Sequence, residues 1–388
     1  MASRDSLKNK HFETRAIHSG QIPEDKTGSV TTPLFLSSTF RVSYPGDESG
    51  YVYSRSANPT RVALEKSLAS LENGTHGYAF SSGLAAQSTL LHLLKPGSHV
   101  VAVSDLYGGT RRQFEQVMRN FGLEFSYVDG RDASDFESAV RPSTRLFWLE
   151  TPTNPLLHLI DIAKVSAIGK QHGILTVVDS TFATPYLQQP LDLGADIVLH
   201  SASKYLGGHC DVIAGVLIVR DEKLAEQIGF HQNAMGAILG PLESWLILRG
   251  LKTLHLRMER HSANASKIVE FLSTVDLVEK IYYPGHLGSP VLNNMKLNGG
   301  IVSFELKADL EAVKTFATAL KVFVLAESLG GTESLVNHPA LMTHASVPLE
   351  IRRKFGISNG LIRLSVGVES INDLIEDLQQ ALGLIGKK

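Results

Sequence analysis

Residues 197–209 carry the clearest chemical potential in this sequence, because an apolar run ends there in small hydroxyl residues, one lysine and two glycines. Lys204 follows Ser201 and Ser203 just past a predicted strand end, where α/β sheets bind ligands. The hydroxyls can hold an anion while the amine attacks a carbonyl, since burial lowers the pKa of an amine and frees its lone pair. From this stretch alone, a solvated lysine at a helix start is the alternative.

Two more polar residues follow predicted strands. Asp179 ends the apolar run 174–178, and a carboxylate there is costly unless it is paired. It could cap the next segment or pair with a cationic ring nitrogen. Tyr107 follows the strand 99–103 beside glycines, where its flat ring could stack on a planar ligand.

An asparagine and an arginine complete this set. Asn154 lies just past the apolar run 146–149. Arg363 is the only charge inside the predicted strand 361–366, and its planar fork suits a two-point contact with a carboxylate.

Ser82, Gly83 and Leu84 lie between the short predicted strand 77–80 and an apolar helix that ends near residue 94. The free backbone N–H groups at such a helix start bind phosphate. An ordinary tight turn is an equally good explanation of this motif in isolation.

The elements that position these residues alternate between strand and helix from residue 76 onward, which predicts an α/β fold. We expect an N-terminal arm over residues 1–60, a large sheet domain over 61–255 and a smaller C-terminal α/β domain over 256–388. The strands expected in the smaller domain are 280–283, 300–306, 322–325 and 361–366.

Local periodicity adds expectations for two helices. After Asn58-Pro59, Thr60 could cap a helix whose buried face carries leucines at 64, 68 and 71. A second helix, entered after Tyr107, is expected to bury Phe114, Val117, Met118 and Phe121.

Composition excludes several classes of protein. The 388 residues are 43% apolar and 20% charged with a net charge of −2, so nucleic acid and anionic membranes are not expected partners. Residues 1–10 are polar and no apolar run reaches about 20 residues, so we expect a cytoplasmic protein without a secretory signal or membrane span. The single cysteine, Cys210, excludes an intrachain disulfide and a cysteine-rich metal cage, and we expect no metal.

Together these residues form a set suited to pyridoxal 5′-phosphate and an amino acid. Lys204 could form a Schiff base with the cofactor aldehyde, and Asp179 could keep the ring nitrogen protonated. The turn at 82–84 and the serine hydroxyls could take the phosphate, while Arg363 takes the α-carboxylate of the substrate.

Along nearly its whole length, the chain resembles the Cys/Met-metabolism family of pyridoxal-phosphate enzymes, the trans-sulfuration enzymes. This resemblance implies fold type I, the aspartate-aminotransferase-like fold. The segments that carry it are YSRSANPT (53–60), SSGLAA (81–86), LYGGT (106–110), ETPTNP (150–155), VVDSTF (177–182), HSASKYLGGH (200–209), AESLGG (326–331), MTHAS (342–346) and IRLSVGVE (362–369).

The resemblance implies a role for each candidate residue. Lys204 would also move protons between Cα, Cβ and Cγ, and Tyr107 would help to activate the incoming amine. One site would use two chains, so a dimer is the smallest active unit, and a homotetramer is expected. The cofactor would contact Lys204, Asp179, Ser82, Gly83, Leu84, Ser201, Ser203 and Tyr107, with Tyr53 and Arg55 from the neighbouring subunit; the substrate would contact Arg363, Asn154, Ser328, Thr343, Glu327 and Arg112.

Within the family, local features favour γ-elimination on L-cystathionine, giving L-cysteine, 2-oxobutanoate and ammonia, with hydrogen sulfide as a side product. Glu327 stands where γ-specific members have an acid, and Gly109 where methionine γ-lyases usually have cysteine. The segments ETPTNP, AESLGG and MTHAS look most like those of cystathionine γ-lyases. Val52 departs from the acidic residue that many γ-lyases and γ-synthases carry before Tyr53, which leaves room for relaxed substrate choice.

Several alternatives stay open or are disfavoured. Cystathionine γ-synthase, which replaces the acyl group of an O-acyl-homoserine with cysteine, and a relaxed β/γ-lyase share most of this chemistry. A non-catalytic protein on the same scaffold is disfavoured by the retention of Lys204, Asp179, Tyr107 and Arg363. A nucleotide-binding enzyme would need a glycine fingerprint with an acid about 20 residues further on, which the sequence lacks.

Overall fold

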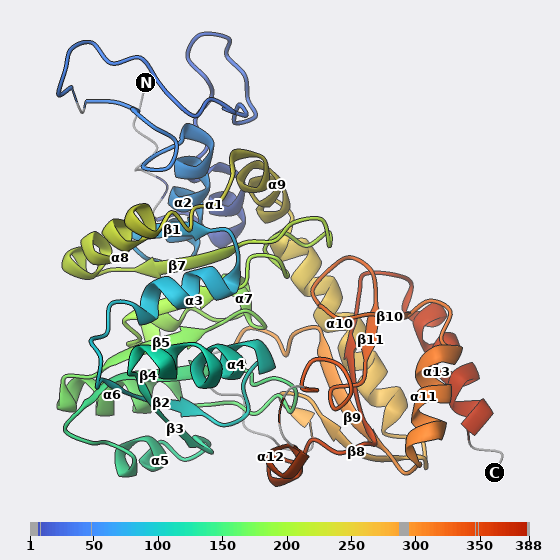
Figure 1. Cartoon of the computed structure of the whole chain (residues 1–388). Helices are drawn as coiled ribbons and strands as arrows, with labels where there is room; N and C mark the ends of the chain where they lie inside the picture. The colour runs from blue at the N-terminus through green and yellow to red at the C-terminus, as the bar shows by residue number, and fades with distance from the viewer. Residues whose placement is uncertain are drawn as a thin grey trace.

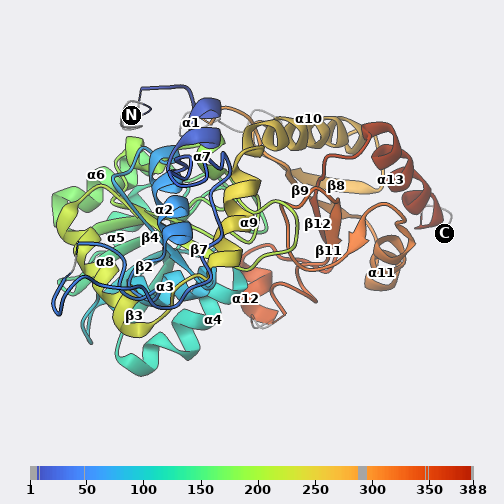
Figure 2. The same cartoon turned by 90° about the horizontal axis from the view of Figure 1, so that it is seen from above.

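The computed structural model describes residues 7, 9–47, 49–286, 295–345, 347 and 349–385. Within these residues the chain forms two sheets covered by helices (Figure 1). Viewed from above, the two parts lie side by side, with helix α10 (Leu254–Leu272) running from one to the other (Figure 2). The predicted α/β architecture with a second, smaller layer is confirmed. The expected domain boundary at 255/256 falls within α10 and stays a prediction, as do the limits of the arm.

The larger sheet has the order β1-β7-β6-β5-β4-β2-β3. β7 is antiparallel to its neighbours β1 and β6, and the other pairs are parallel. The carboxyl ends of all strands except β7 therefore meet at one edge. The strands are β1 (His76–Phe80), β2 (His99–Val103), β3 (Glu124–Val128), β4 (Thr144–Glu150), β5 (Leu175–Asp179), β6 (Ile197–His200) and β7 (Gly215–Val219).

Helices cover both faces of this sheet, which is why its strands are nearly continuous apolar runs rather than alternating ones. β2, β6 and β7 are buried along their whole length. One face carries α3 (Gly83–Leu91), α6 (Ile162–His172) and α8 (Glu222–Met235), and the other α2 (Pro59–Leu71), α7 (Thr184–Leu187) and α9 (Pro241–Leu251). Also present are α4 (Gly108–Gln116), α5 (Ser134–Ser138) and the 3-10 turns η2 (Met118–Phe121) and η3 (Pro190–Leu193).

The smaller sheet has the order β10-β11-β12-β9-β8. α10, α11 (Leu310–Ala319) and α13 (Ile371–Ile385) share one apolar core with it, and α12 (Leu349–Lys354) lies near its edge. The strands predicted here all form, with ends shifted by one or two residues. They are β8 (Val278–Tyr282), β9 (Ile301–Leu306), β10 (Val324–Leu325) and β12 (Leu361–Ser365), and β11 (Leu335–Asn337) is an additional short strand.

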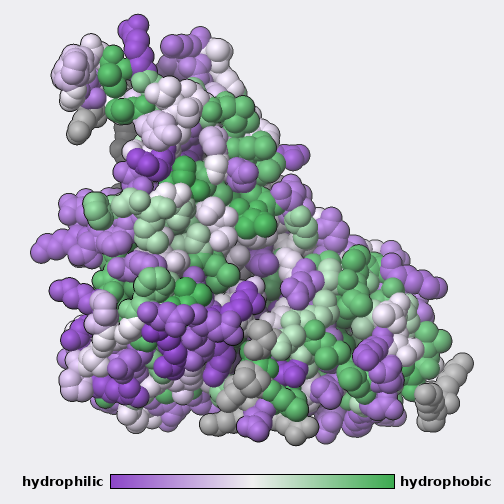
Figure 3. All heavy atoms as spheres, viewed as in Figure 1, coloured by the Kyte–Doolittle hydropathy of each residue, from purple (hydrophilic) through white to green (hydrophobic). Residues whose placement is uncertain are grey.

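The N-terminal segment carries helix α1 (Phe12–His18) and two loops that stand away from the body at the top of Figure 1. Hydrophobic side chains remain at the surface of these loops (Figure 3). The most exposed include Val30 at 83%, Leu36 at 71% and Tyr44 at 62%. Water contact with so many apolar side chains on one segment is unfavourable, so this arm has the character of an interface.

Two local predictions were wrong in detail. Asn58, not Thr60, caps α2: its Oδ1 accepts the N–H groups of Thr60 and Arg61 at 2.9 and 3.4 Å. Pro59 already occupies the first helical position, so the cap must precede it. The buried face of leucines 64, 68 and 71 is confirmed.

The helix after Tyr107 is shorter than predicted. α4 ends at Gln116, and the chain continues as the 3-10 turn η2, which changes the direction of the later side chains. Phe114 and Met118 are buried, but Val117 is 44% and Phe121 59% exposed. A 3.6-residue period therefore placed Val117 and Phe121 on the wrong face.

Replacing Asn58 tests the importance of this cap. The Asn58 amide also donates to Phe35 O at 2.8 Å and Ser54 Oγ at 3.0 Å. Asn58→Ala removes the cap and leaves buried backbone groups without partners, so we expect a loss of about 2 kcal/mol in the free energy of unfolding by urea.

The matched control is Asn120→Ala, since Asn120 is exposed and its amide makes one bond, to Gln116 O. Its effect should stay within about 0.5 kcal/mol. Equal losses in the two variants would contradict a special role for Asn58.

Candidate active site

A cavity of about 530 Å³ opens at the carboxyl edge of the larger sheet and is closed on its other side by residues of the C-terminal part. It brings together residues that are far apart in the sequence but follow β1, β2, β4, β5 and β6. The candidate residues that line it are Ser82, Gly83, Leu84, Tyr107, Asn154, Asp179, Ser201, Ser203, Lys204, Glu327, Ser328, Thr343 and Arg363.

Lys204 lies in this cavity four residues beyond the end of β6. Its Nζ donates a hydrogen bond to Ser328 Oγ at 3.0 Å. Burial, aided by the positive charge of Arg363, lowers the pKa of Lys204 to about 8. A substantial fraction of this amine is therefore neutral near physiological pH and can act as a nucleophile or a base.

Arg363 lies on β12, in the middle of the smaller sheet, and is 2% exposed. Its Nη1 donates to Asn154 Oδ1 at 2.7 Å and its Nη2 to Ser328 O at 3.1 Å, while its buried Nε has no protein partner among the described residues. Burial lowers its pKa to about 10, which still leaves it charged at neutral pH. A buried cation with donor capacity to spare is suited to a carboxylate ligand.

Ser328 contacts both cations and has a strained backbone. Its φ of 106° lies in the region that side chains other than glycine rarely adopt. This conformation is held where the hydroxyl accepts from Lys204 and the carbonyl accepts from Arg363. Strain of this kind persists only where the surrounding contacts enforce it, which is common in functional sites.

Asp179 ends β5 and is oriented by its neighbour Thr181. Asp179 Oδ1 accepts the Thr181 N–H at 3.0 Å and its hydroxyl at 2.5 Å, and Thr181 Oγ1 in turn accepts the Ser201 N–H at 2.9 Å. Burial nonetheless raises the pKa of Asp179. A cationic group entering the cavity beside it would stabilise its charged form.

The turn after β1 has the geometry of an anion site. Ser82 caps α3 by accepting the Ala85 N–H at 3.0 Å, and the amides of Gly83 and Leu84 have no protein acceptor among the described residues. A Cβ on Gly83 would lie 3.2 Å from Ser201 Cβ, so a larger residue would narrow the space between the turn and that serine. The Ser203 hydroxyl is bonded to the backbone of Ala214.

Tyr107 immediately precedes α4 and is 40% exposed in the single chain. Its backbone N–H donates to Glu150 Oε2 at 2.9 Å. A Cβ on Gly109 would lie 2.3 Å from the Tyr107 ring, so the ring rests directly against this glycine.

Three candidate residues do not line the cavity of their own chain. Arg112 is exposed on α4 and does not line the cavity, so its role stays a prediction. Tyr53 and Arg55 are exposed on the N-terminal segment, where Arg55 Nε donates to Asn233 Oδ1 at 3.2 Å. Ser346, the last residue of the MTHAS segment, lies outside the described residues.

Several cavity residues were missed by reasoning from the sequence, among them two that carry polar groups at strand ends. Glu150 ends β4 and Thr181 follows β5, and both lie in segments, ETPTNP and VVDSTF, that carry the family resemblance. Their positions at strand ends were the available signal, since the same criterion identified Asp179.

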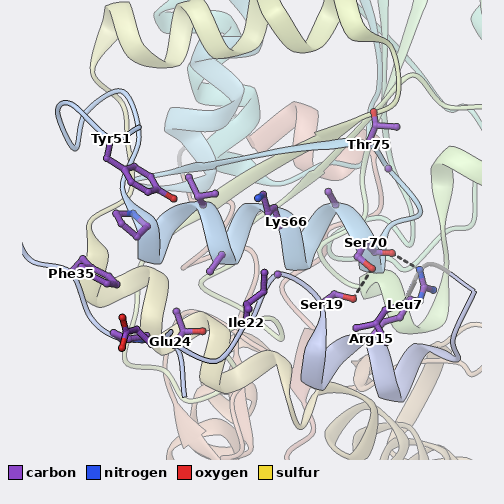
Figure 4. A pocket seen from close by; sticks show the side chains of 18 of the residues that line it. Leu7, Arg15, Ser19, Ile22, Glu24, Phe35, Tyr51, Lys66, Ser70 and Thr75 are labelled. Atoms are coloured by element: carbon purple, nitrogen blue, oxygen red, sulfur yellow. Dashed lines mark hydrogen bonds between the residues drawn. The ribbon is translucent and has the colours of Figure 1, made fainter. Parts of the chain in front are cut away.

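A second groove of about 830 Å³ lies between the N-terminal segment and α2 (Figure 4). Its walls include Ile22, Phe35 and Tyr51, and Arg15 and Ser19 are hydrogen-bonded to Ser70 inside it. Its lining also includes Arg15, Glu24 and Lys66, but Arg15 is bonded to Ser70 and Asn73, and Glu24 to Thr27. Among the described residues, no cluster of three or more His, Cys, Asp or Glu could hold a metal ion, and no helix combines the length and apolar composition needed to cross a bilayer.

The family model described as "Cys/Met metabolism PLP-dependent enzyme" matches residues 13–383 of this chain. The chain belongs to that family. The resemblance seen in the sequence is thereby confirmed, together with its cofactor, pyridoxal 5′-phosphate.

Named relatives span several activities. A cystathionine beta-lyase of Coxiella burnetii is 51% identical over 97% of this chain and 98% of its own length. A cystathionine gamma-synthase/O-acetylhomoserine (thiol)-lyase of Bacillus subtilis is 46% identical over 96% of this chain and 97% of its own. The crystal structure of a cystathionine gamma-lyase from Lactobacillus plantarum, complexed with L-serine, superimposes with a TM-score of 0.93 at 48% identity, over 97% of this chain and 99% of that one. The fold type I prediction is therefore confirmed, and the protein is a pyridoxal-phosphate-dependent lyase of this family.

The residues in the cavity fit the cofactor by the chemistry of their donors. Free amides and a serine are available for a phosphate, Lys204 supplies a low-pKa amine for an aldehyde, and Asp179 supplies a carboxylate for a ring nitrogen.

The pKa of Lys204 predicts how the cofactor-free protein captures pyridoxal 5′-phosphate. Only the neutral amine attacks an aldehyde, so the initial capture rate should rise with pH and level off above about pH 8. A stopped-flow pH series, following the visible absorption of the bound cofactor, measures this profile. An exposed lysine would give a rate that still rises about tenfold per pH unit near pH 9, and that result would contradict the lowered pKa.

Proposed function

We propose that this enzyme cleaves L-cystathionine by elimination at Cγ, giving L-cysteine, 2-oxobutanoate and ammonia. The observation that carries the choice of Cγ is the position of Glu327, whose side chain lines the same cavity as Lys204 and Arg363. An acid there can attract the distal amine of cystathionine and so hold the long substrate in the register that presents Cγ.

The cofactor-holding roles rest on the contacts described above. The free amides of Gly83 and Leu84, with Ser201, would bind the phosphate, and Asp179 would pair with the ring nitrogen. When bound, the cofactor supplies an electron-withdrawing ring that stabilises negative charge at the substrate Cα.

Lys204 would perform the proton transfers. Its lowered pKa allows it to accept a proton from Cα near neutral pH and to return protons to carbons further along the substrate. The bond to Ser328 Oγ keeps the amine oriented within the cavity. Tyr107, which also lines the cavity, would stack on the cofactor ring and assist the incoming amine.

Arg363 and Asn154 would orient the substrate. The guanidinium has donors for a carboxylate, and the Asn154 side chain holds it in place through the 2.7 Å bond. Because this cation is buried and its position is fixed by hydrogen bonds, it would hold the α-carboxylate at one place in the cavity that Lys204 also lines. Thr343, which also lines the cavity, would support this contact.

Elimination at Cβ is a second candidate function. It is favoured by the beta-lyase name of the 51% identical relative and by Val52, an apolar and exposed residue before Tyr53. The gamma-synthase reaction is a third, because it shares the same residues up to the point where cysteine attacks.

A product assay separates these functions. With cystathionine alone, γ-elimination gives 2-oxobutanoate and cysteine, whereas β-elimination gives pyruvate and homocysteine. We expect 2-oxobutanoate to exceed pyruvate by at least about tenfold. An excess of pyruvate would reject the γ proposal, and a much higher kcat/KM for an O-acyl-homoserine plus cysteine would favour the synthase.

Glu327→Gln tests the reason for this preference. Loss of the charge should raise KM for cystathionine and lower the ratio of 2-oxobutanoate to pyruvate by about tenfold. Glu333→Gln is the matched control, since Glu333 is exposed and does not line the cavity. An unchanged product ratio in Glu327→Gln would contradict a role of the Glu327 carboxylate in the preference for elimination at Cγ.

We also propose that two chains build each site, with Tyr53 and Arg55 reaching the phosphate of the neighbouring subunit. In the single chain neither residue lines the cavity, and both are exposed on a segment rich in exposed apolar side chains. A closed dimer would cover these side chains and complete both sites. We expect a homotetramer made of two such dimers.

Subunit complementation tests this arrangement. Arg55→Ala should weaken cofactor binding about tenfold, whereas Arg41→Ala, an exposed arginine on the same segment, should not. Lys204→Ala should be inactive. If Arg55 crosses, mixed dimers of Lys204→Ala and Arg55→Ala contain one intact site, so at limiting cofactor their activity should exceed the sum of the two variants. A strictly additive mixture, despite exchange of subunits shown by mass spectrometry, would contradict the crossing.

A further inference from the structure

Glu150 is a buried acid in the cavity to which the proposed reaction gives no part. It ends β4, is 5% exposed and lines the cavity beside the candidate residues. Its one protein hydrogen bond among the described contacts is accepted by Oε2 from the backbone N–H of Tyr107, at 2.9 Å.

Glu150 stands directly beside Asp179. The two residues are register partners on the parallel strands β4 and β5, so their side chains emerge from the same face of the sheet. Two buried carboxylates at this spacing repel each other when both are ionised. Asp179 has the hydrogen bonds from Thr181 that favour its ionised form, and Glu150 has no comparable set.

The other charged groups that face Glu150 come from two further elements. Asp105, which follows β2, adds to the repulsion, and Arg363 of β12 opposes it. Two nitrogens of the Arg363 guanidinium donate to Asn154 and Ser328. The net effect is that the pKa of Glu150 lies well above its ordinary value. Burial is the largest cause, and the charge of Asp179 is the second.

Tyr107 needs such a support because of where it stands in the chain. It precedes α4, its side chain is 40% exposed, and no side chain bonds to its hydroxyl among the described residues. Glu150 fixes its backbone, and Gly109 fixes its ring, which lies in the space that a Cβ would occupy.

We propose that Glu150 is a positioning residue that holds Tyr107 at the cofactor face of the cavity. It does so as a neutral carboxylic acid. Asp179 is then the ionised carboxylate of the pair. A neutral acid keeps its carbonyl oxygen as acceptor for the tyrosine N–H. It also avoids a second negative charge beside the ring nitrogen of the cofactor. The inference rests on the proposed stacking role of Tyr107.

The isosteric variant Glu150→Gln and the truncation Glu150→Ala test both parts. Glutamine is always neutral and retains an acceptor oxygen for the Tyr107 N–H, so Glu150→Gln should keep the hydrogen bond that Glu150→Ala removes. The readouts are the dissociation constant of pyridoxal 5′-phosphate from the cofactor-free protein, the circular dichroism of the bound cofactor in its visible band, and kcat and KM for cystathionine.

We expect Glu150→Ala to raise the cofactor dissociation constant about tenfold and to reduce the visible dichroism, because the tyrosine is no longer fixed over the ring. Glu150→Gln should stay within about threefold of the wild type in each readout. Combined with Tyr107→Ala, the alanine variant should add little further loss, since Glu150 acts on cofactor binding through the tyrosine ring, which Tyr107→Ala has already removed.

The outcomes distinguish this inference from the roles on which it rests. If glutamine is as damaging as alanine, Glu150 acts as an anion and the neutral-acid claim fails. If Glu150→Ala and Tyr107→Ala losses are fully additive, Glu150 does not act through the tyrosine. If Tyr107→Ala alone leaves cofactor binding and dichroism intact, the stacking role itself is wrong, whatever Glu150 does.

Discussion

The buried guanidinium of Arg363 is the interaction on which the rest of the site depends. It comes from the smaller sheet, yet one of its hydrogen bonds crosses to Asn154, beyond β4 of the larger sheet. Its second bond holds the backbone of Ser328 in a strained conformation, and that serine accepts from Lys204. A charge removed from water in this way is costly unless its partners are in place, so the cation fixes the relative position of the two parts.

The larger sheet supplies the rest of the positioning through its strand directions. Because only β7 runs against the others, the segments that follow the remaining strands gather at one edge. This edge places a helix start with free amides, a buried carboxylate and a lysine around a single cavity. Desolvation there changes the properties of these groups: it lowers the pKa of Lys204 to about 8 and raises that of Asp179. The reactivity of the amine is thus a consequence of burial rather than of a special sequence around it.

Much of this arrangement could be predicted from the sequence, because polar residues at the ends of apolar runs stand out. Asp179 and Lys204 were found in this way, and Arg363 as the only charge inside a predicted strand; the structure places all three in one cavity. The criterion has a limit. Glu150 also ends a strand, but only the register with Asp179 shows that two buried carboxylates lie side by side. Pairing between strands is a tertiary fact that spacing along one strand does not contain.

Helix ends and exposure were harder to predict for a related reason. Periodicity indicates which residues share a face only while the helix keeps its pitch, and the change from α4 to η2 exposed Val117 and Phe121. Arg112 matched a motif by position in the sequence, yet it is exposed and outside the cavity lining. The position of a residue in a motif indicates which residue of the family it corresponds to. Its burial and the direction of its side chain depend on the packing of distant elements.

The two parts of the chain supply different groups to the cavity, and this has a consequence for how its specificity can change. Groups suited to the cofactor come from residues 82–204, whereas Glu327, Ser328, Thr343 and Arg363 come from the C-terminal part. A substitution at Glu327 can therefore alter the wall proposed to meet the distal end of a substrate while the groups suited to the cofactor stay in place. Relatives at 46 to 51% identity carry beta-lyase, gamma-lyase and gamma-synthase names, so several named activities occur among chains this similar.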